Sequence, residues 1–378
     1  MKPATCARKF VGVLAYLLFL FAVVEIALQV FYYVTAGDFL FRRVALPLYQ
    51  SEQFAGFKNR PNLSFDHHTN EFRARYYTNS AGFRVPRPGI EYSVAKPPDT
   101  YRIMLLGPSF AYGWGVEYEK SFAALLPRFL AERGFAKGRK IELIDAGVPA
   151  MYAAPQRIWY EHVGKKYQPD LVMQFVYGSM AVSSSTAPKF VVDGSGHLTE
   201  KALSAAQRWR ERVKQLATVF YGWMVWTELD TKLNAGTHAN SNSVIGAGRE
   251  LHQTSRFDPG GPEERDARKF YELLTKTVRA SGAQLEIVYF PLSYGVHPQD
   301  ESRWRHLGLK DVQAHKAYDA AFMGYLNKRD IPGIDISDAL RHAAARDGRR
   351  LYYWLDIHWT PEGNAAAASA VAAALTKP

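Results

Sequence analysis

The chain begins with one long apolar run and then changes to shorter blocks in which apolar and polar positions alternate. Residues 10–35 are almost wholly apolar, and Glu25 carries the only charge among them. With a rise of about 1.5 Å per residue, a helix of this length crosses about 30 Å of hydrocarbon. The run is longer than the roughly 7–15 apolar residues of a cleaved signal peptide, and no convincing cleavage site follows it. This pattern predicts a transmembrane signal anchor over residues 10–35.

The charges around the apolar run set its expected orientation. Several basic residues precede it within residues 1–9, which favours a cytoplasmic tail and an extracytoplasmic location for everything after the span. Arg42 and Arg43 on the far side weaken this orientation without reversing it. Glu25 has two interpretations: a helix–helix contact with a membrane partner, or a single charge that the bilayer tolerates.

Two patterns follow each other beyond the span. Residues 36–99 form an N-terminal extension rich in aromatic residues, Arg and Pro, in which 76–84 indicates a short strand and a turn with a glycine at positive φ. From residue 100 onward, short apolar strands alternate with helical segments. We expect strands at 101–106, 141–144, 171–177, 285–290 and 333–336, and helices at 121–133, 156–166, 266–280, 311–328 and 361–376. Strands separated by helical segments of about 10–15 residues predict an α/β domain over 100–378, with a parallel sheet and helices on both faces.

Residues 181–261 interrupt this alternation. They contain a polar helix at 200–215, an aromatic segment at 219–226 and a tract rich in Gly, Ser and Asn at 235–248. The simplest interpretation is an insertion over the carboxyl edge of the sheet that acts as a lid or as a partner surface.

Composition narrows the class of protein further. The 378 residues are 47% hydrophobic and 22% charged, which supports a substantial core and rules out a wholly disordered chain. The single cysteine, Cys6, excludes an intrachain disulfide framework and a cysteine-clustered metal site, and no cofactor motif is present. The net charge of +11 favours anionic partners. Nucleic acid is not expected among them, because no basic run is interleaved with aromatic residues and the predicted location is extracytoplasmic.

The first segment with possible chemistry follows the first strand of the predicted sheet. Ser109 lies in the glycine-flanked turn Gly107-Pro108-Ser109, at the carboxyl edge where sites of α/β proteins assemble. The backbone N–H groups that follow can stabilise an oxyanion. Read alone, the segment is equally well explained as an ordinary loop.

The second segment precedes the last helix. Thr360 is a suitable N-cap residue and Pro361 a suitable first helical residue, so His358 falls in the loop that enters this helix, with Asp356 two residues earlier. A nucleophilic serine needs a base, and the base needs an orienting group; Ser109, His358 and Asp356 are the right three residue types. The alternative is a loop whose histidine bonds nearby backbone. A metal site would need further ligands to which the sequence does not point.

Two more strand ends supply candidate oxyanion donors. Gly147 follows the second strand and can offer its N–H, or it simply makes the turn. Ser179 ends the third strand and either donates a hydrogen bond into the site or belongs to a structural loop.

Together these four blocks resemble the SGNH (GDSL-like) hydrolase superfamily, over about residues 100–180 and 283–376. The resemblance implies a flavodoxin-like sheet with Ser109 as nucleophile, His358 as base, Asp356 as its orienting acid, and Gly147 and Ser179 as oxyanion donors. The Asp-x-His-Trp-Thr spelling is most similar to the branch that includes alginate O-acetyltransferase proteins, which work on exopolysaccharide in the bacterial periplasm. The segment YYTNSAGFR at 76–84 is also similar to extensions beside SGNH domains encoded with polysaccharide genes.

Two positions depart from the family pattern. Pro108 replaces the aspartate before the serine and has no backbone N–H, and Ser179 replaces the oxyanion asparagine. Losing one oxyanion donor typically costs about 10²–10³ in rate. The pattern therefore suits a slow or specialised acyl transferase, and it also suits a degenerate enzyme kept for binding.

Two functional hypotheses follow from the resemblance. The first is an esterase or O-acetyltransferase that is anchored in the bacterial inner membrane by one span and modifies a polysaccharide or other acylated glycan in the periplasm. The second is a non-catalytic SGNH-like protein that binds polysaccharide or docks to a membrane synthesis or export complex. Aromatic residues beside the site are candidates for stacking on sugar rings, although some of them are expected in the core: Tyr112, Trp114, Tyr177, Trp354 and Trp359. We expect His297 and Asp300 to be solvated surface residues.

Overall fold

The computed structural model describes residues 3–36, 39–40, 48–69, 71–151, 153–177, 190–192, 198–200, 205–213, 216–222, 225, 262–301, 312–354 and 356–377. The chain forms two compact units. The smaller consists of 1–47, 68–70 and 202–237, and the larger of 48–67, 71–201 and 238–378.

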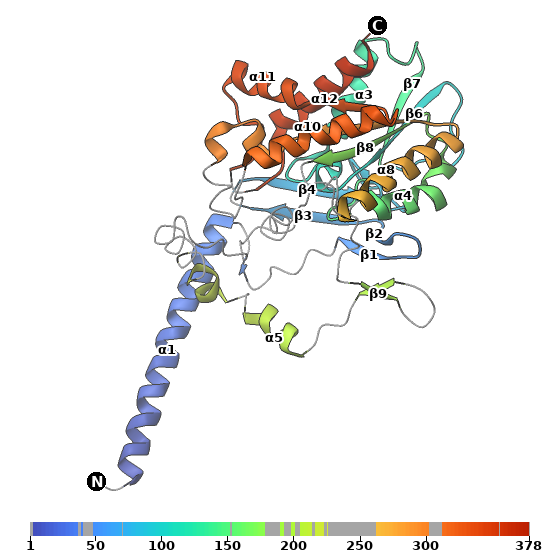
Figure 1. Cartoon of the computed structure of the whole chain (residues 1–378). Coiled ribbons are helices and arrows are strands. Elements are labelled where there is room, and N and C mark those ends of the chain that lie inside the picture. Colours follow the sequence, from blue (N-terminus) through green and yellow to red (C-terminus); the bar gives the residue numbers. More distant parts are fainter. Residues whose placement is uncertain are drawn as a thin grey trace. The chain divides into compact units, whose positions relative to one another are not determined.

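The larger unit is built on a sheet in which strands are ordered β12-β11-β8-β6-β7-β5-β4-β3 (Figure 1). Its parallel strands are β6 (Thr100–Leu106), β7 (Lys140–Asp145), β8 (Leu171–Tyr177), β11 (Gln284–Phe290) and β12 (Gly333–Asp335). The predicted parallel sheet is thus confirmed, and each of its strands lies within two residues of the expected range.

Helices cover both faces of this sheet, as the alternation of strands and helices predicts. One face carries α3 (Phe122–Glu132), α11 (Ser337–Asp347) and α12 (Pro361–Leu375), and the other carries α4 (Ala153–His162), α8 (Pro262–Ala280) and α10 (Val312–Lys328). Successive side chains of a strand enter opposite cores: Ile103 and Leu105 pack with α3, whereas Met104 and Leu106 pack with α4. Helix α11 has no counterpart among the predicted helices.

The N-terminal extension continues the sheet beyond β7. Its strands are β3 (Ser64–His68), β4 (Arg73–Thr78) and β5 (Arg84–Val85); β5 pairs antiparallel with both β4 and β7. A separate hairpin joins β1 (Tyr49–Glu52) to β2 (Gly56–Asn59). The expected turn between β4 and β5 has Gly82 at φ +91°, where an added Cβ would lie 2.5 Å from the carbonyl oxygen of Asn59. The boundary expected at residue 100 therefore falls inside one compact unit.

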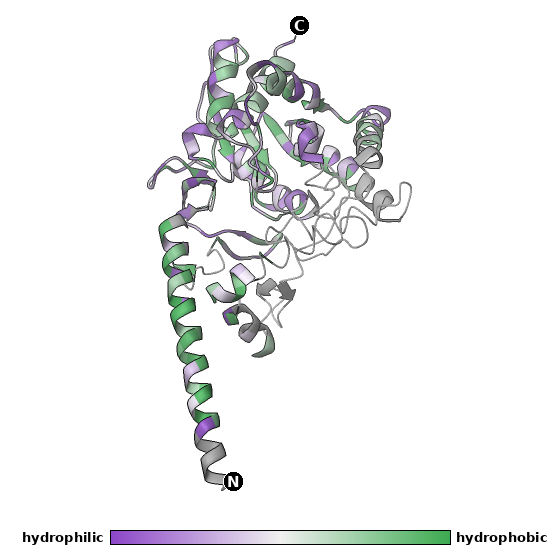
Figure 2. Ribbon diagram, turned by 90° about the vertical axis from the view of Figure 1, so that its left-hand side faces the viewer, coloured by the Kyte–Doolittle hydropathy of each residue, from purple (hydrophilic) through white to green (hydrophobic). Residues whose placement is uncertain are grey.

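The smaller unit contains α1 (Pro3–Ala36), which includes the apolar helix Lys9–Val34. This helix is long and apolar enough to cross a membrane, and most of it has the green hydrophobic colour in Figure 2. Glu25 accepts hydrogen bonds from the backbone N–H groups of Ala217 (2.7 Å) and Thr218 (2.9 Å), where the helical segment 217–222 begins. Glu25 thus has a partner within its own chain, which neither sequence-based interpretation anticipated.

Only parts of the expected insertion at 181–261 are described: β9 (Phe190–Val192), β10 (Leu198–Glu200), α5 (Ala205–Val213), residues 216–222 and residue 225. Strands β9 and β10 form an antiparallel pair. The predicted role of the insertion as a lid falls largely outside the described residues.

Candidate functional site

Ser109 stands at the carboxyl end of β6, where the chain turns at once into the short helix α2 (Ser109–Tyr112). Gly107 permits this sharp entry, because an added Cβ would lie 2.6 Å from the Cβ of Ala111 and 2.7 Å from that of Phe175. Gly113 ends the helix in a left-handed conformation, with φ +69°. Ser109 remains partly exposed, while the rest of α2 is buried.

The loop before α12 holds the second half of the site. Thr360 caps this helix by accepting a hydrogen bond from Gly363 N–H (3.1 Å), and Pro361 opens it, which confirms the predicted helix start. A β-bridge between Tyr352 and Trp359 closes the loop across its base. Both ends of the loop are therefore held in place, and Asp356 and His358 lie between these ends.

The structure brings Ser109, His358 and Asp356 together. His358 Nε2 lies 2.5 Å from Ser109 Oγ, and His358 Nδ1 contacts Asp356 Oδ1. Asp356 Oδ1 also accepts the backbone N–H of His358 at 2.9 Å. Burial alone would raise the pKa of Asp356, but attraction to His358 and these hydrogen bonds lower it below its ordinary value. An ionised Asp356 holds the imidazole ring so that Nε2 can accept a proton from Ser109.

Gly147 lies against the backbone of α2, since an added Cβ there would be 2.5 Å from Tyr112 N. Its N–H donates to Asp145 Oδ1 at 3.0 Å, so a bound oxyanion would have to share this donor or displace the carboxylate. Burial raises the pKa of Asp145 to about 7, against the opposing effects of Arg84 and of the Gly147 hydrogen bond. Ser179, the other candidate donor, lies outside the described residues.

The candidate sugar-stacking residues divide by exposure. Tyr112, Tyr177 and Trp359 are 0%, 3% and 1% exposed and belong to the core, where their rings are not available to a sugar. Trp114 is partly exposed, and Trp354 is 46% exposed. Only these two of the five predicted aromatic contacts have surface to offer.

His297 and Asp300 are not surface residues, contrary to the expectation from sequence; they are 5% and 0% exposed. Asp300 forms a bidentate ion pair with Arg350, and His297 Nε2 accepts the N–H of Leu351 at 3.1 Å. Both residues hold the start of the loop that carries Asp356 and His358. Their polar character suggested exposure to solvent, whereas both are buried by long-range pairing with the segment that holds Arg350 and Leu351.

Three polar residues of the N-terminal extension, Asn59, Glu71 and Arg84, contact the loops that carry Gly147, Asp356 and the end of α2. Arg84 lies in the segment whose resemblance to SGNH-associated extensions was visible in the sequence. Asn59 and Glu71 had no such signal.

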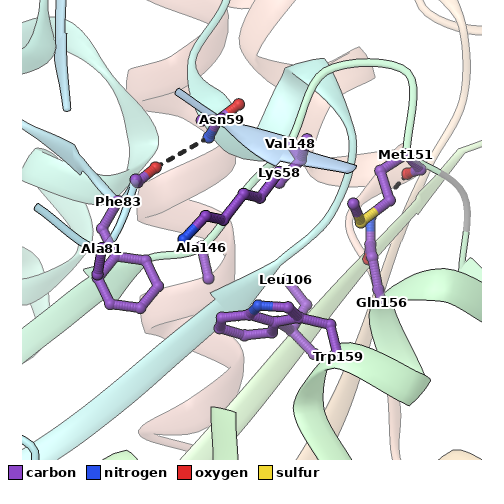
Figure 3. A pocket seen from close by; sticks show the side chains of 11 residues that line it. Lys58, Asn59, Ala81, Phe83, Leu106, Ala146, Val148, Met151, Gln156 and Trp159 are labelled. Carbon is purple, nitrogen blue, oxygen red and sulfur yellow. Dashed lines mark hydrogen bonds between the residues drawn. The ribbon is translucent and has the colours of Figure 1, made fainter. Parts of the chain in front are cut away.

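A small pocket opens between β2, the turn at 81–83 and α4 (Figure 3). It is lined by Lys58, Asn59, Ala81, Gly82, Phe83, Leu106, Ala146, Val148, Met151, Gln156 and Trp159. None of Ser109, Asp356 and His358 lines it, so this pocket is not part of the candidate catalytic site.

Comparisons with known proteins found one family and several relatives to which this chain is similar. Residues 251–378 match the family described as the SGNH hydrolase-like domain of acetyltransferase AlgX. A curated relative, the probable alginate O-acetylase AlgJ of Pseudomonas fluorescens, is 27% identical over 156 residues, which are 40% of this chain and 37% of the relative. The match thus spans little more than a third of that protein's length.

Solved structures with a similar course of the chain include several hydrolases. An acetyl xylan esterase is 14% identical with a TM-score of 0.41 (72% of this chain, 98% of the other). An alpha/beta hydrolase from the metagenome of Lake Arreo, Spain, is 14% identical with a TM-score of 0.40 (73% and 94%). An acetylxylan esterase from Geobacillus stearothermophilus is 11% identical with a TM-score of 0.38 (74% and 95%).

The family match and the curated relative confirm the resemblance that the sequence blocks indicated. The chain carries an α/β domain of the SGNH hydrolase type. Within that superfamily its similarity is to the alginate O-acetyltransferase-like branch.

Proposed function

We propose that this protein is a membrane-anchored serine esterase or O-acetyltransferase that moves an acyl group to or from a cell-surface or exported polysaccharide in the periplasm. The observation that carries the proposal is the position of His358, whose two ring nitrogens contact Ser109 and Asp356. Similarity to an acetyltransferase domain supports the acyl chemistry. The apolar helix Lys9–Val34 supports the anchor.

The chemistry follows from these contacts. Ser109 Oγ attacks the acyl carbonyl carbon while His358 Nε2 takes the hydroxyl proton, and Asp356 stabilises the resulting imidazolium. When the tetrahedral intermediate collapses, His358 returns this proton to the leaving oxygen, and the acyl group stays on Ser109. A glycan hydroxyl or water then attacks the acyl-enzyme by the reverse sequence, which gives transfer or hydrolysis respectively.

Charge on the oxyanion needs hydrogen-bond donors. Ser109 opens α2, and the first N–H groups of a helix have no acceptor within it. The Ser109 N–H, the Gly147 N–H and the hydroxyl of Ser179 are the proposed donors. Because Asp145 already accepts from Gly147, we expect slow turnover with simple esters.

The proposed acceptor or donor is a glycan. Trp114 and Trp354 both have exposed indole surface, and Trp354 lies two residues before Asp356 in the chain. Indole rings offer a large apolar face on which a sugar can stack. Trp114 lies 6.0 Å from the ring of His358, measured between centroids. The net charge of +11 favours acidic polymers over neutral ones.

The test is active-site labelling of the full-length protein in detergent with a fluorophosphonate probe, which phosphonylates an activated serine with loss of fluoride. We expect labelling of the wild type and loss of labelling in Ser109→Ala and His358→Ala. Ser80→Ala and His342→Ala replace exposed residues of the same types and serve as matched controls that label normally.

Each other outcome changes the proposal. Labelling that survives Ser109→Ala would place the reactive serine elsewhere and refute the assignment. No labelling of the wild type above the Ser109→Ala background would favour the non-catalytic hypothesis, in which the same scaffold binds polysaccharide or docks to a membrane complex. If labelling succeeds, release of acetate from an acetylated acidic polysaccharide, with and without an acceptor glycan, distinguishes hydrolysis from transfer.

A further inference from the structure

We infer that Asn59, Glu71 and Arg84 of the N-terminal extension are positioning residues, each of which holds one of the three loops that form the proposed site. The inference rests on the proposed function, and it assigns to the extension an indirect part in the chemistry, through the loops that it holds. The three loops are the turn after Ser109, the loop of Asp356 and His358, and the turn at Gly147.

Arg84 holds the turn after Ser109. Its guanidinium is fully buried and donates from Nη1 to the carbonyl oxygens of Tyr112 and Gly113 (the latter at 2.6 Å), and from Nη2 to that of Val116 at 2.6 Å. The first two carbonyls lie at the end of α2, the helix that Ser109 begins, and the third lies in the turn that follows it. A planar fork with several donors can bind three backbone oxygens at once, which a lysine ammonium cannot reproduce.

Glu71 holds the loop of Asp356 and His358. Its Oε1 accepts the backbone N–H of Trp354 at 2.5 Å, and its Oε2 accepts that of Asp356 at 2.7 Å. Two charge-assisted bonds from one carboxylate fix the backbone on both sides of residue 355. The position of the Asp356 carboxylate, and through it that of His358, therefore depends on a residue 285 positions away in the sequence.

Asn59 holds the turn at Gly147. Its Nδ2 donates to the carbonyl oxygen of Gly147 at 2.8 Å and to that of Gly82 at 3.2 Å; the second bond is drawn in Figure 3. Asn59 is 2% exposed, so these bonds form away from competing water. The side-chain amide of Asn59 thereby fixes the peptide group that follows Gly147. The N–H of Gly147 itself donates to Asp145.

The same extension also contains a hydrogen-bonded pair, Ser80 and Glu91, that lies outside these three loops. Glu91 accepts hydrogen bonds from Ser80 N (2.9 Å) and Ser80 Oγ (2.7 Å). Glu91 is therefore an acid of the same extension that, like Glu71, accepts two hydrogen bonds, but its partner Ser80 lies outside the three loops. Glu91→Gln is the matched control for Glu71→Gln.

The experiment has two arms, both on the full-length protein in detergent. Backbone hydrogen exchange, followed by mass spectrometry, reports on peptides that cover 109–116, 145–151 and 352–359. Fluorophosphonate labelling at a series of probe concentrations gives the maximal labelling rate and the half-saturating concentration separately. The variants are Glu71→Gln, Glu71→Asp, Asn59→Ala, Arg84→Lys and Glu91→Gln.

We expect each substitution to loosen its own loop. Glu71→Gln should raise exchange at 352–359 about 10-fold and lower the maximal labelling rate about 10- to 100-fold, because small displacements of reacting groups cost rates of this order. The half-saturating concentration stays unchanged, and Glu71→Asp, which keeps both carboxylate oxygens, restores part of the rate. Asn59→Ala raises exchange at 145–151, Arg84→Lys raises it at 109–116, and Glu91→Gln leaves all three peptides as in the wild type.

Two results would overturn the inference. One is unchanged exchange at 352–359 and unchanged labelling in Glu71→Gln. The other is a uniform rise in exchange over all three loops, which would mean that Glu71 only stabilises the fold. If the wild type does not label at all, the proposed function fails, but the exchange arm still decides whether the extension holds these loops.

Discussion

Asp145 is a fully buried acid directly behind the proposed oxyanion glycine. Because burial raises its pKa from 3.8 to about 7, the folded protein keeps a proton on this carboxyl over a pH range in which the unfolded chain has lost it. The folded state then binds more protons than the unfolded state, so the free energy of unfolding falls as the pH rises from about 4 to about 7, and this contribution is level above that. The slope reaches at most about 1.4 kcal/mol per pH unit.

Asp145→Asn should remove this slope while keeping an oxygen that accepts the Gly147 N–H. We therefore expect the difference in free energy of unfolding, variant minus wild type, to be larger at pH 8 than at pH 4.5. Urea unfolding of both proteins at the two pH values measures this difference. Burial also raises the pKa of Glu286 to about 7, so part of the pH dependence persists until Glu286→Gln is added. An Asp145→Asn protein with the full wild-type slope would show that the carboxyl is ionised in the folded state.

At the scale of single residues, the sequence identified those groups whose position follows from local rules. Ser109 follows a strand, and His358 precedes an N-cap, so both could be placed at the carboxyl edge of a parallel sheet. Asn59 and Glu71 lie in a part of the sequence without a clear hydrophobic period, and their partners are 88 and 285 residues away. No periodicity or spacing predicts such contacts, because only the folded chain brings their partners near.

At the scale of elements, strongly patterned segments were predictable and weakly patterned ones were not. Strands β6, β8 and β11 are mostly apolar, with a single polar side chain inside each apolar run, and their predicted positions agree with the structure. Helix α11 has Leu340 as its only large apolar residue, so no strong hydrophobic period marks it in the sequence. Strand β5 has only two residues, so its role in joining the extension to β7 could not be read from alternation.

The contact between α1 and the segment 217–222 is an element-scale feature that can be tested. Glu25 accepts three hydrogen bonds there, from Ala217 N, Thr218 N and Thr218 Oγ, and Phe31 and Tyr32 pack edge-to-face on Tyr221 and Phe220. Removal of the carboxylate leaves these donors unpaired, at a cost of about 1–3 kcal/mol for each buried donor. The segment should then separate from α1.

Limited digestion with chymotrypsin measures this separation. In Glu25→Ala we expect cleavage after Phe220 and Tyr221 to become several-fold faster than in the wild type. Cleavage after Trp209, which is 67% exposed in α5, is the internal control and should not change. Equal rates after Tyr221 in the two proteins would mean that Glu25 does not hold the segment, and an unrelated membrane partner would again be the better explanation of this acid.

At the scale of the whole molecule, the proposed site lies in a unit of its own, and α1 belongs to the other unit. The proposed function needs the larger unit outside the cytoplasm, where exported glycans are found, and this depends on the charges that flank the apolar helix. Basic residues on the cytoplasmic side oppose translocation of that side. Lys2, Arg8 and Lys9 precede the apolar run at 10–35, whereas Arg42 and Arg43 follow it. The difference in positive charge that sets the orientation is therefore small.

This small difference predicts how orientation responds to charge. In spheroplasts of a Gram-negative host, external protease should digest the larger unit of the wild type and leave an N-terminal tag protected. Replacement of Arg42 and Arg43 by Glu should leave that pattern intact or sharpen it. Replacement of Lys2, Arg8 and Lys9 by Glu should convert part of the population to the opposite orientation, with the tag digested, because the basic residues then lie only after the span. If the wild-type larger unit is protected while the tag is digested, the larger unit faces the cytoplasm, and a role on periplasmic glycan is excluded even if Ser109 labels.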